Sequence, residues 1–432
     1  MLRDQWHTFE GRGGALVWDA RAQGDEDLPC GCPTRLLSRV SKGHHWRCDQ
    51  RPSTQTSLAP RGAETWRLYA VMGIGSFVVN GLGAVLLPLQ TDLGVDYASV
   101  ALYPTVYSLS TIAVGLVGAP LARRLGHTRL LIVSLALLIA GAALFWLPSR
   151  PATLVGALVL GLGTACMLQV VPGRLSQLYG TRTDIAMSEA NSAASFSAIA
   201  PALLVGAVLG LGITWRFGFL APILAAGLVL LISTLRHQPD DDRPAPAPLA
   251  ATHGTGAWLV PFVGAILVVS SEFALVFWSA SVTSERFAVD DSVAVITMGA
   301  LISGIAIGRL FGRGVISRLT PYAAAMSAIA VALAGFITFF ASPVYPVAVL
   351  GLFVNGLGLS IVYPILATRI LAAFPGNTER GSQLTVLAIG TSTGLSPLLL
   401  GVLAGQMELH LATLIVPVYL VTLAVLLTLR RI

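Results

Sequence analysis

Long apolar stretches separated by short polar breaks fill most of this 432-residue sequence after its first sixty-odd positions. Each stretch is about 20 residues long, the length at which an α-helix crosses a hydrocarbon layer of about 30 Å. The breaks, such as the one at 148–151, carry charged or turn-forming residues that do not suit a membrane interior. The pattern predicts twelve helices, at 67–90, 99–121, 129–148, 151–173, 187–211, 215–235, 257–280, 292–312, 321–341, 343–368, 382–405 and 411–429.

Composition supports a membrane protein over a soluble one. Apolar residues make up 55% of the chain, charged residues 11%, and the mean hydropathy is +0.76. Soluble domains carry roughly 25% charged residues, so most side chains here must face lipid or other buried helices. We therefore predict an all-α membrane protein and exclude a single soluble core.

The arginines indicate an orientation, because short cytoplasmic loops retain positive charge. If the N-terminus is cytoplasmic, only Arg150, Arg216 and Arg286 fall in loops on the opposite side. The cytoplasmic side then holds Arg123, Arg124, Arg129, Arg174, Arg182, Arg236, Arg243, Arg309, Arg313, Arg318, Arg369, Arg380, Arg430 and Arg431. We predict a multi-pass protein of the plasma (inner) membrane with both termini cytoplasmic. Topology accounts for the net charge of +6, so we infer no nucleic-acid partner.

One long polar interruption, at 237–256, divides the predicted helices into two sets of six. An offset of 192 aligns Asn80 with Glu272 and Pro172 with Pro364, and Gly115 with Gly308 and Pro201 with Pro397 follow at nearby offsets. This repeat favours two pseudo-symmetric six-helix halves. The predicted organisation is a tail at 1–66, one bundle at 67–236, a cytoplasmic linker at 237–256 and a second bundle at 257–432.

Glu272 is the only acidic residue that the pattern places well inside a span. A charged group at the centre of a membrane helix costs about 2.5–3.5 kcal/mol on insertion scales, so it normally lines a polar cavity or finds a partner. Such a carboxyl can hold and release a proton. Two interpretations stay open, a proton-coupling role for Glu272 and a purely structural role in helix packing.

Other polar side chains at membrane depth are candidates for a solute cavity. They are Asn80, Tyr107, Gln169, Ser271, Trp278, Asn355 and Tyr363. Because no Lys or Arg is predicted at mid-membrane depth, the set suits a neutral or weakly polar solute. The alternative for each is an ordinary role, since intramembrane amides and hydroxyls often bond one helix to another.

The break at 121–127 resembles the cytoplasmic signature of the major facilitator superfamily, with Arg124 and Gly126 at matching positions. The signature's acidic position holds Arg123 here, which removes the acid of its charge relay. In the second half, segments 271–278, 304–310 and 356–376 are similar to the fucose-permease-like sugar:proton symporters, and Arg309 lies in one of them. The resemblance implies alternating access, with the first, fourth, seventh and tenth spans around a central cavity.

We therefore expect a secondary active transporter for a small solute, with protons as coupling ion, embedded in lipid as a monomer. The alternatives are a drug or metabolite exporter of the same superfamily and a non-transporting membrane sensor or assembly factor. No catalytic set of residues is evident, so neither enzyme activity nor a cofactor is predicted. The tail is expected to be disordered, and a start codon assigned too far upstream would explain it. The spacing of its metal-ligand types does not match common zinc sites, so no metal is predicted at Cys30, Cys32, His44, His45 and Cys48.

Overall fold

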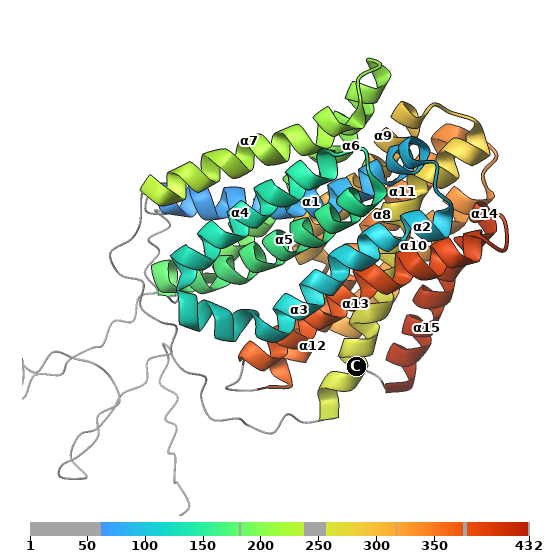
Figure 1. Ribbon diagram of the computed structural model, residues 1–432. Coiled ribbons are helices and arrows are strands. Elements are labelled where there is room, and N and C mark those ends of the chain that lie inside the picture. The colour runs from blue at the N-terminus through green and yellow to red at the C-terminus, as the bar shows by residue number, and fades with distance from the viewer. Residues whose placement is uncertain (1–61, 181–182, 237–255, 317, 375–377, 431–432) are drawn as a thin grey trace, which may run out of the picture. The chain divides into compact units, whose positions relative to one another are not determined.

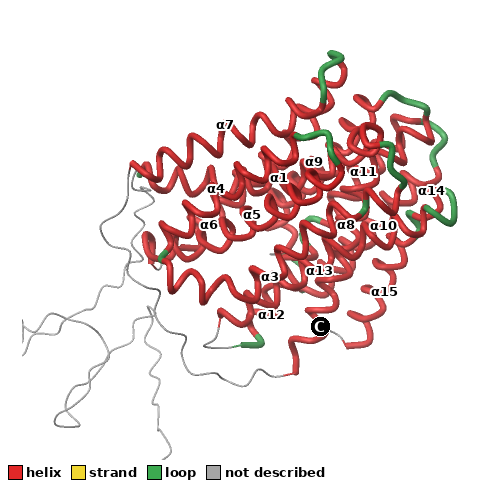
Figure 2. Tube along the Cα trace, in the orientation of Figure 1, coloured by secondary structure: helices red, strands yellow, loops and turns green. Residues whose placement is uncertain are grey.

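The computed structural model describes residues 62–180, 183–236, 256–316, 318–374 and 378–430, and every regular element in these ranges is a helix (Figures 1 and 2). The first six spans comprise α1 (Ala63–Leu93), α2 (Tyr97–Val100), α3 (Leu102–Leu125), α4 (His127–Trp146), α5 (Arg150–Tyr179), α6 (Thr183–Gly210) and α7 (Trp215–Arg236). The other six comprise η3 (Gly256–Trp258), α8 (Leu259–Phe287), α9 (Asp291–Ile316), α10 (Pro321–Ala341), α11 (Tyr345–Leu359), α12 (Val362–Ala372), α13 (Thr378–Ala404), α14 (Leu409–Ala412) and α15 (Ile415–Arg430).

Twelve stretches in the described ranges are long and apolar enough to cross a membrane, which confirms the predicted number of spans. We call α1 to α7 the N-half and η3 to α15 the C-half. The end of the bundle where α1 begins and α15 ends is called the terminal end, and the opposite end is called the distal end.

Turn chemistry ends the helices at the membrane faces. Gly94 adopts a left-handed conformation (φ 58°), and its N–H caps α1 by donating to the carbonyls of Gln90 and Thr91. Gly126 has φ 79° and joins α3 to α4 with a single residue. A side chain at this φ would be strained, so glycine makes the tight turn possible.

Several helices run farther than predicted. In two of them a partner satisfies an arginine that would otherwise end a membrane helix. The predicted helix at 151–173 continues to Tyr179, since Arg174 forms an ion pair with Glu64. The predicted helix at 257–280 continues to Phe287, since Arg286 donates to the carbonyls of Phe339 and Ser342. The predicted helix at 343–368 is instead two helices, α11 and α12.

The two halves repeat the same packing, which confirms the predicted pseudo-symmetry. In the N-half α4 packs on α5, α3 on α5 and α1 on α6, and the counterparts in the C-half are α10 on α11, α9 on α11 and α8 on α13. Close crossings repeat as well. Gly141 lies against Leu160 as Gly335 lies against Asn355, and an added Cβ at either glycine would fall within 2.6 Å of its neighbour's backbone nitrogen. These pairs give offsets of 194 and 195, slightly larger than the 192 taken from the sequence.

The contacts between the halves extend inward from the distal end along two helix pairs, α3 with α13 and α6 with α9 (Figure 1). On the first pair, a Cβ at Gly401 would lie 2.7 Å from that of Ala101, and Thr105 donates to the carbonyl of Gly394. On the second pair, a Cβ at Gly206 would lie 2.4 Å from Cγ1 of Ile296. Small residues therefore let the helices of opposite halves approach closely and form a distal seam.

Several sequence predictions lie outside the described residues. They are almost all of the tail at 1–66 with its cysteine and histidine set, and the linker at 237–256 up to its last residue. Within the described residues, no group of three or more His, Cys, Asp or Glu side chains is placed to hold a metal ion. The domain boundaries remain predictions.

Candidate functional site

The helices α1 and α8 cross at the boundary between the halves. Gly83 of α1 lies against Val276 of α8, where an added Cβ would be 2.6 Å from the Val276 carbonyl oxygen. Asn80 precedes Gly83 by three residues and Glu272 precedes Val276 by four, so each shares a helix face with the residue at the crossing. Both side chains are half-buried. Asn80 and Glu272 therefore lie one turn from the crossing, on the faces that α1 and α8 turn toward the other half.

Glu272 belongs to a set of polar side chains that four helices of the C-half bring together. The guanidinium of Arg309, on α9, is close enough to interact electrostatically with the Glu272 carboxylate. The hydroxyl of Tyr363, on α12, is in range of both charges, and Thr385 of α13 lies beside it. We call these four residues the C-half polar cluster. Within the described part of the chain, Glu272 makes no hydrogen bond, so its carboxylate is not committed to holding helices together.

Unlike the Glu272 carboxylate, the side chain of Asn80 already makes one hydrogen bond. Its Nδ2 donates to the carbonyl oxygen of Ser76 at 2.9 Å, one turn earlier on α1. The amide oxygen makes no hydrogen bond among the described residues and is left as an acceptor. A hydrogen-bonding solute between the halves could thus meet an amide on one side and the carboxyl and phenol groups of the C-half polar cluster on the other.

A serine row on α6 extends the same boundary toward the terminal end. Near the distal end this face packs on α9 through Ala202 and Gly206. About two to four turns from Ala202 toward the terminal end it continues with Ser195, Ser192 and Ser188, of which the last two are exposed. Ser192 and Ser195 donate to carbonyls four residues earlier on α6, so their oxygens keep acceptor capacity. The halves are thus sealed at the distal end along α6, and this face is accessible nearer the terminal end.

Three of the predicted cavity residues are packed inside the protein. Trp278 is fully buried and donates from Nε1 to the Pro397 carbonyl at 3.1 Å, in the distal seam. Asn355 is also fully buried and donates from Nδ2 to the carbonyl of Ala332 at 2.8 Å. Tyr107 is 3% exposed and lies beside Thr164 of α5 within the N-half. For these three residues the geometry fits the helix-to-helix alternative, because each is packed between two neighbouring helices.

The two remaining predicted cavity residues, Ser271 and Gln169, fit neither description: they are not part of the C-half polar cluster and, among the described residues, do not bond one helix to another. Ser271 is buried beside Glu272 and donates to the carbonyl of Leu267 at 3.0 Å. Gln169 is half-buried on α5, with its Cγ against Gly118 of α3. Gln169 lies on the fourth span and Ser271 on the seventh, as expected, but neither residue belongs to the C-half polar cluster.

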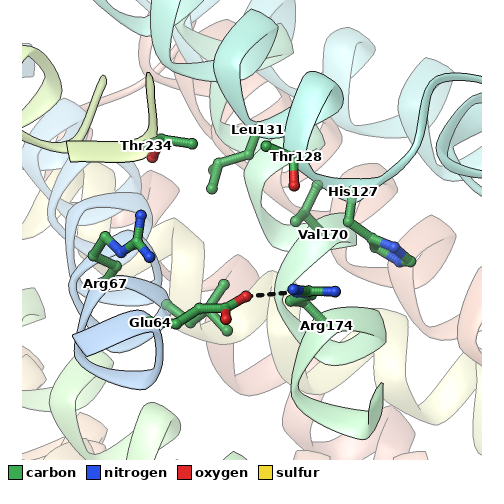
Figure 3. A pocket seen from close by; sticks show the side chains of 9 residues that line it. Glu64, Arg67, His127, Thr128, Leu131, Val170, Arg174 and Thr234 are labelled. Carbon is green, nitrogen blue, oxygen red and sulfur yellow. Dashed lines mark hydrogen bonds and ion pairs between the residues drawn. The ribbon is translucent and has the colours of Figure 1, made fainter. Parts of the chain in front are cut away.

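A second polar region lies at the terminal end of the N-half (Figure 3). Arg174 of α5 forms a 2.6 Å ion pair with Glu64 of α1, and Arg67 donates to the Ser233 carbonyl of α7 at 3.1 Å. A space of about 30 Å³ lies beside this pair, next to His127 at the start of α4. That volume corresponds to about one water molecule, so the region ties helices together and offers little room for a solute.

This region bears on the short turn at 121–127, which resembles the cytoplasmic signature of the major facilitator superfamily. Arg124 is exposed in the last turn of α3, Gly126 forms the turn, and the side chain of Arg123 lies outside the described part of the chain. The turn lacks the signature's acid, and the acid that pairs with Arg174 comes from α1, as Glu64. Sequence reasoning did not single out Glu64, because it lies in the segment assigned to the tail.

Comparisons with known proteins identify the family by sequence and a shared fold by structure. The family model described as Major Facilitator Superfamily matches residues 68–396. A bacterial homolog of the human lysosomal transporter Spinster, solved inward-facing and occupied, superimposes with a TM-score of 0.69 at 16% identity over 85% of this chain and 96% of that one. The nucleoside transporter NupG (D323A mutant) gives 0.68 at 13% identity, covering 83% and 98%.

The similar structures also include the fucose transporter FucP in the outward conformation. It gives a TM-score of 0.57 at 18% identity, covering 85% of this chain and 98% of that one; the E. coli protein is described as a fucose:proton symporter. No curated protein sequence matches the chain. At these identities the structures show a shared fold and do not transfer a substrate.

Proposed function

We infer that this chain, which belongs to the Major Facilitator Superfamily, moves a small, neutral or weakly polar solute across the plasma membrane together with protons. The observation that carries the proposal is the position of Glu272. Glu272 lies one helical turn from the α1–α8 crossing, makes no hydrogen bond among the described residues and has Arg309 nearby. Such a group is free to exchange a proton as the protein changes conformation.

The proposed orientation places the terminal end in the cytoplasm. Arginines at described terminal-end positions include Arg124, Arg174, Arg236, Arg369 and Arg380. Among the described residues, the distal end holds three arginines: Arg150, Arg216 and Arg286. The asymmetry follows the rule that cytoplasmic loops keep positive charge. In this orientation the distal seam closes the outer side, and the serine row on α6 is accessible from the cytoplasm.

The proposed cycle alternates this state with one in which the distal seam opens. A protonated Glu272 is neutral and can donate a hydrogen bond to a solute hydroxyl, while Asn80 offers its amide oxygen from the other half. When the proton leaves, Arg309 provides a counter-charge within the same half, so the carboxylate need not be buried alone. Coupling results if the halves rearrange readily only when Glu272 is protonated and solute is bound.

The test uses the full chain in proteoliposomes with a pH-sensitive dye in the lumen and a panel of radiolabelled hexoses, pentoses, polyols and nucleosides. At least one solute is expected to accumulate under an inward proton gradient and to acidify the lumen as it enters. Proton movement in the opposite direction would identify an exporter that exchanges solute for protons. Absence of flux for every compound would favour the non-transporting sensor, and sodium-dependent uptake without proton movement would exclude proton coupling.

A further inference from the structure

A groove lies on the N-half between α1, α6 and α7. Its volume is about 420 Å³, within the range of about 300–1,000 Å³ usual for small-molecule sites. Its lining combines larger apolar side chains, among them Trp66 and Phe77, with a row of small residues on all three helices: Ala70 and Gly73 of α1, Ala193 and Ala200 of α6, and Ala226 of α7. The groove is therefore apolar and lies apart from the boundary between the halves.

The groove exists because α1 and α7 touch at two separate places. Toward the distal end, Phe77 stacks on Phe219 with ring centroids 6.2 Å apart. At the terminal end, Arg67 donates to the Ser233 carbonyl. Between these contacts the small side chains leave the space open. At the floor, α6 approaches α1 so closely that a Cβ at Gly73 would lie 2.8 Å from the Ser197 hydroxyl.

The position of the groove on membrane-spanning helices indicates what kind of molecule would bind in it. All three helices are long and apolar enough to cross a membrane, so an occupant that enters this groove from the bilayer would be an acyl chain. Trp66 lines it near the start of α1 and is 62% exposed, as aromatic side chains at a membrane interface commonly are. Exposed Arg236 ends α7 ten residues after Ala226, which is about 15 Å along the helix. Along this line the apolar groove would match an acyl chain, the interfacial tryptophan the boundary between acyl chain and head group, and the arginine the phosphate of a phospholipid.

We propose that this groove binds one acyl chain of an anionic phospholipid from the leaflet at the terminal end, with the head-group phosphate near Arg236. A cation near the membrane surface attracts anionic lipid, and the small residues give the chain a slot that a flat helix surface lacks. A second copy of the protein and the transported solute are the other possible occupants, and each gives a different result in the test.

The experiment is native mass spectrometry of the full chain released from nanodiscs of phosphatidylglycerol or of phosphatidylcholine. The variant Ala226→Phe fills the groove, and Ala225→Phe is its matched control, because Ala225 is also exposed on α7 but does not line the groove. Ala70→Phe fills the groove from α1 and replaces Ala226→Phe if that variant fails to fold.

The wild type is expected to retain one phosphatidylglycerol per chain. Filling the groove should reduce retention about tenfold, the effect of losing contact with about two methylene groups, while Ala225→Phe should leave it unchanged. Equal retention by Ala226→Phe and the wild type would overturn the proposal. So would a dimer that dissociates in Ala226→Phe, or displacement of the lipid by a transported compound from the solute panel. Equal retention of phosphatidylcholine would overturn the assignment of the head group to Arg236.

Discussion

The two halves share a fold but use their acidic residues differently. In the N-half, Glu64 and Asp92 lie at opposite ends of α1, and each forms a 2.6 Å ion pair with an arginine of another helix. In the C-half, Glu272 lies near the middle of α8 without a hydrogen bond among the described residues. The acids at the ends of α1 thus hold helices of the N-half together through ion pairs. The acid in the middle of α8 remains available to bind a proton.

The largest loss of stability is expected at the distal end of α1. The Asp92 carboxylate accepts hydrogen bonds from Trp215 Nε1 at 2.7 Å and from Arg216 Nη1 at 2.6 Å. Asp92→Ala should lower the free energy of unfolding by about 2–3 kcal/mol, because it leaves a largely buried guanidinium without its carboxylate. Unfolding in mixed micelles measures this. Glu408→Ala removes an exposed distal acid that makes no capping bond and should change stability by less than about 0.5 kcal/mol.

A smaller effect is expected at the terminal end, where Arg174 is 11% and Glu64 29% exposed. A double-mutant cycle with Glu64→Gln and Arg174→Gln should give a coupling energy of about 1 kcal/mol, since the pair is only partly shielded from water. The same unfolding assay measures the four proteins of the cycle. A coupling energy near zero would mean that Glu64 does not fasten α1 to α5 and would weaken the contrast between the halves.

The smallest effect on stability is expected for Glu272→Gln, below about 0.5 kcal/mol, because the substitution keeps the side chain's shape and breaks no hydrogen bond of the described structure. Glu285→Gln is the matched control, since Glu285 is exposed at the distal end of the same helix. Destabilisation by Glu272→Gln comparable to that of Asp92→Ala would show that Glu272 is structural and that both halves use their acids alike.

Hydrophobic period and break chemistry were sufficient to predict the number of spans and the two-fold repeat, because a bilayer requires about 20 apolar residues per crossing. They were insufficient where the end of a helix depends on a partner that is distant in the sequence. Arg174 does not end α5, since Glu64 neutralises it from 110 positions earlier in the chain. The break between α11 and α12 lies inside a mostly apolar stretch, and its cause is local: Pro364 has no N–H to donate to the carbonyl of Ser360. The sequence analysis used Pro364 only as a match in the repeat.

The candidate site shows the same limit. Glu272 stood out because a lone acid in an apolar span is costly, whereas the orientation of the other polar residues depends on helix rotation, which spacing alone does not fix. Asn355 and Trp278 therefore looked equivalent to Asn80 and Tyr363 in the sequence, although the fold buries the first two. Arg309 was assigned to the terminal end by its position in the chain, and only the packing of α8 against α9 brings it near Glu272.

The central claim is that Glu272 carries the coupling proton, and the most direct test compares two transport modes of Glu272→Gln in proteoliposomes. The probe is a radiolabelled solute that the wild type accumulates. Accumulation driven by a pH gradient requires a proton to be bound and released, whereas solute exchange across the membrane at equal pH does not. The account predicts that the variant loses gradient-driven accumulation and retains exchange, while Glu285→Gln keeps both. Undiminished accumulation by Glu272→Gln would contradict it.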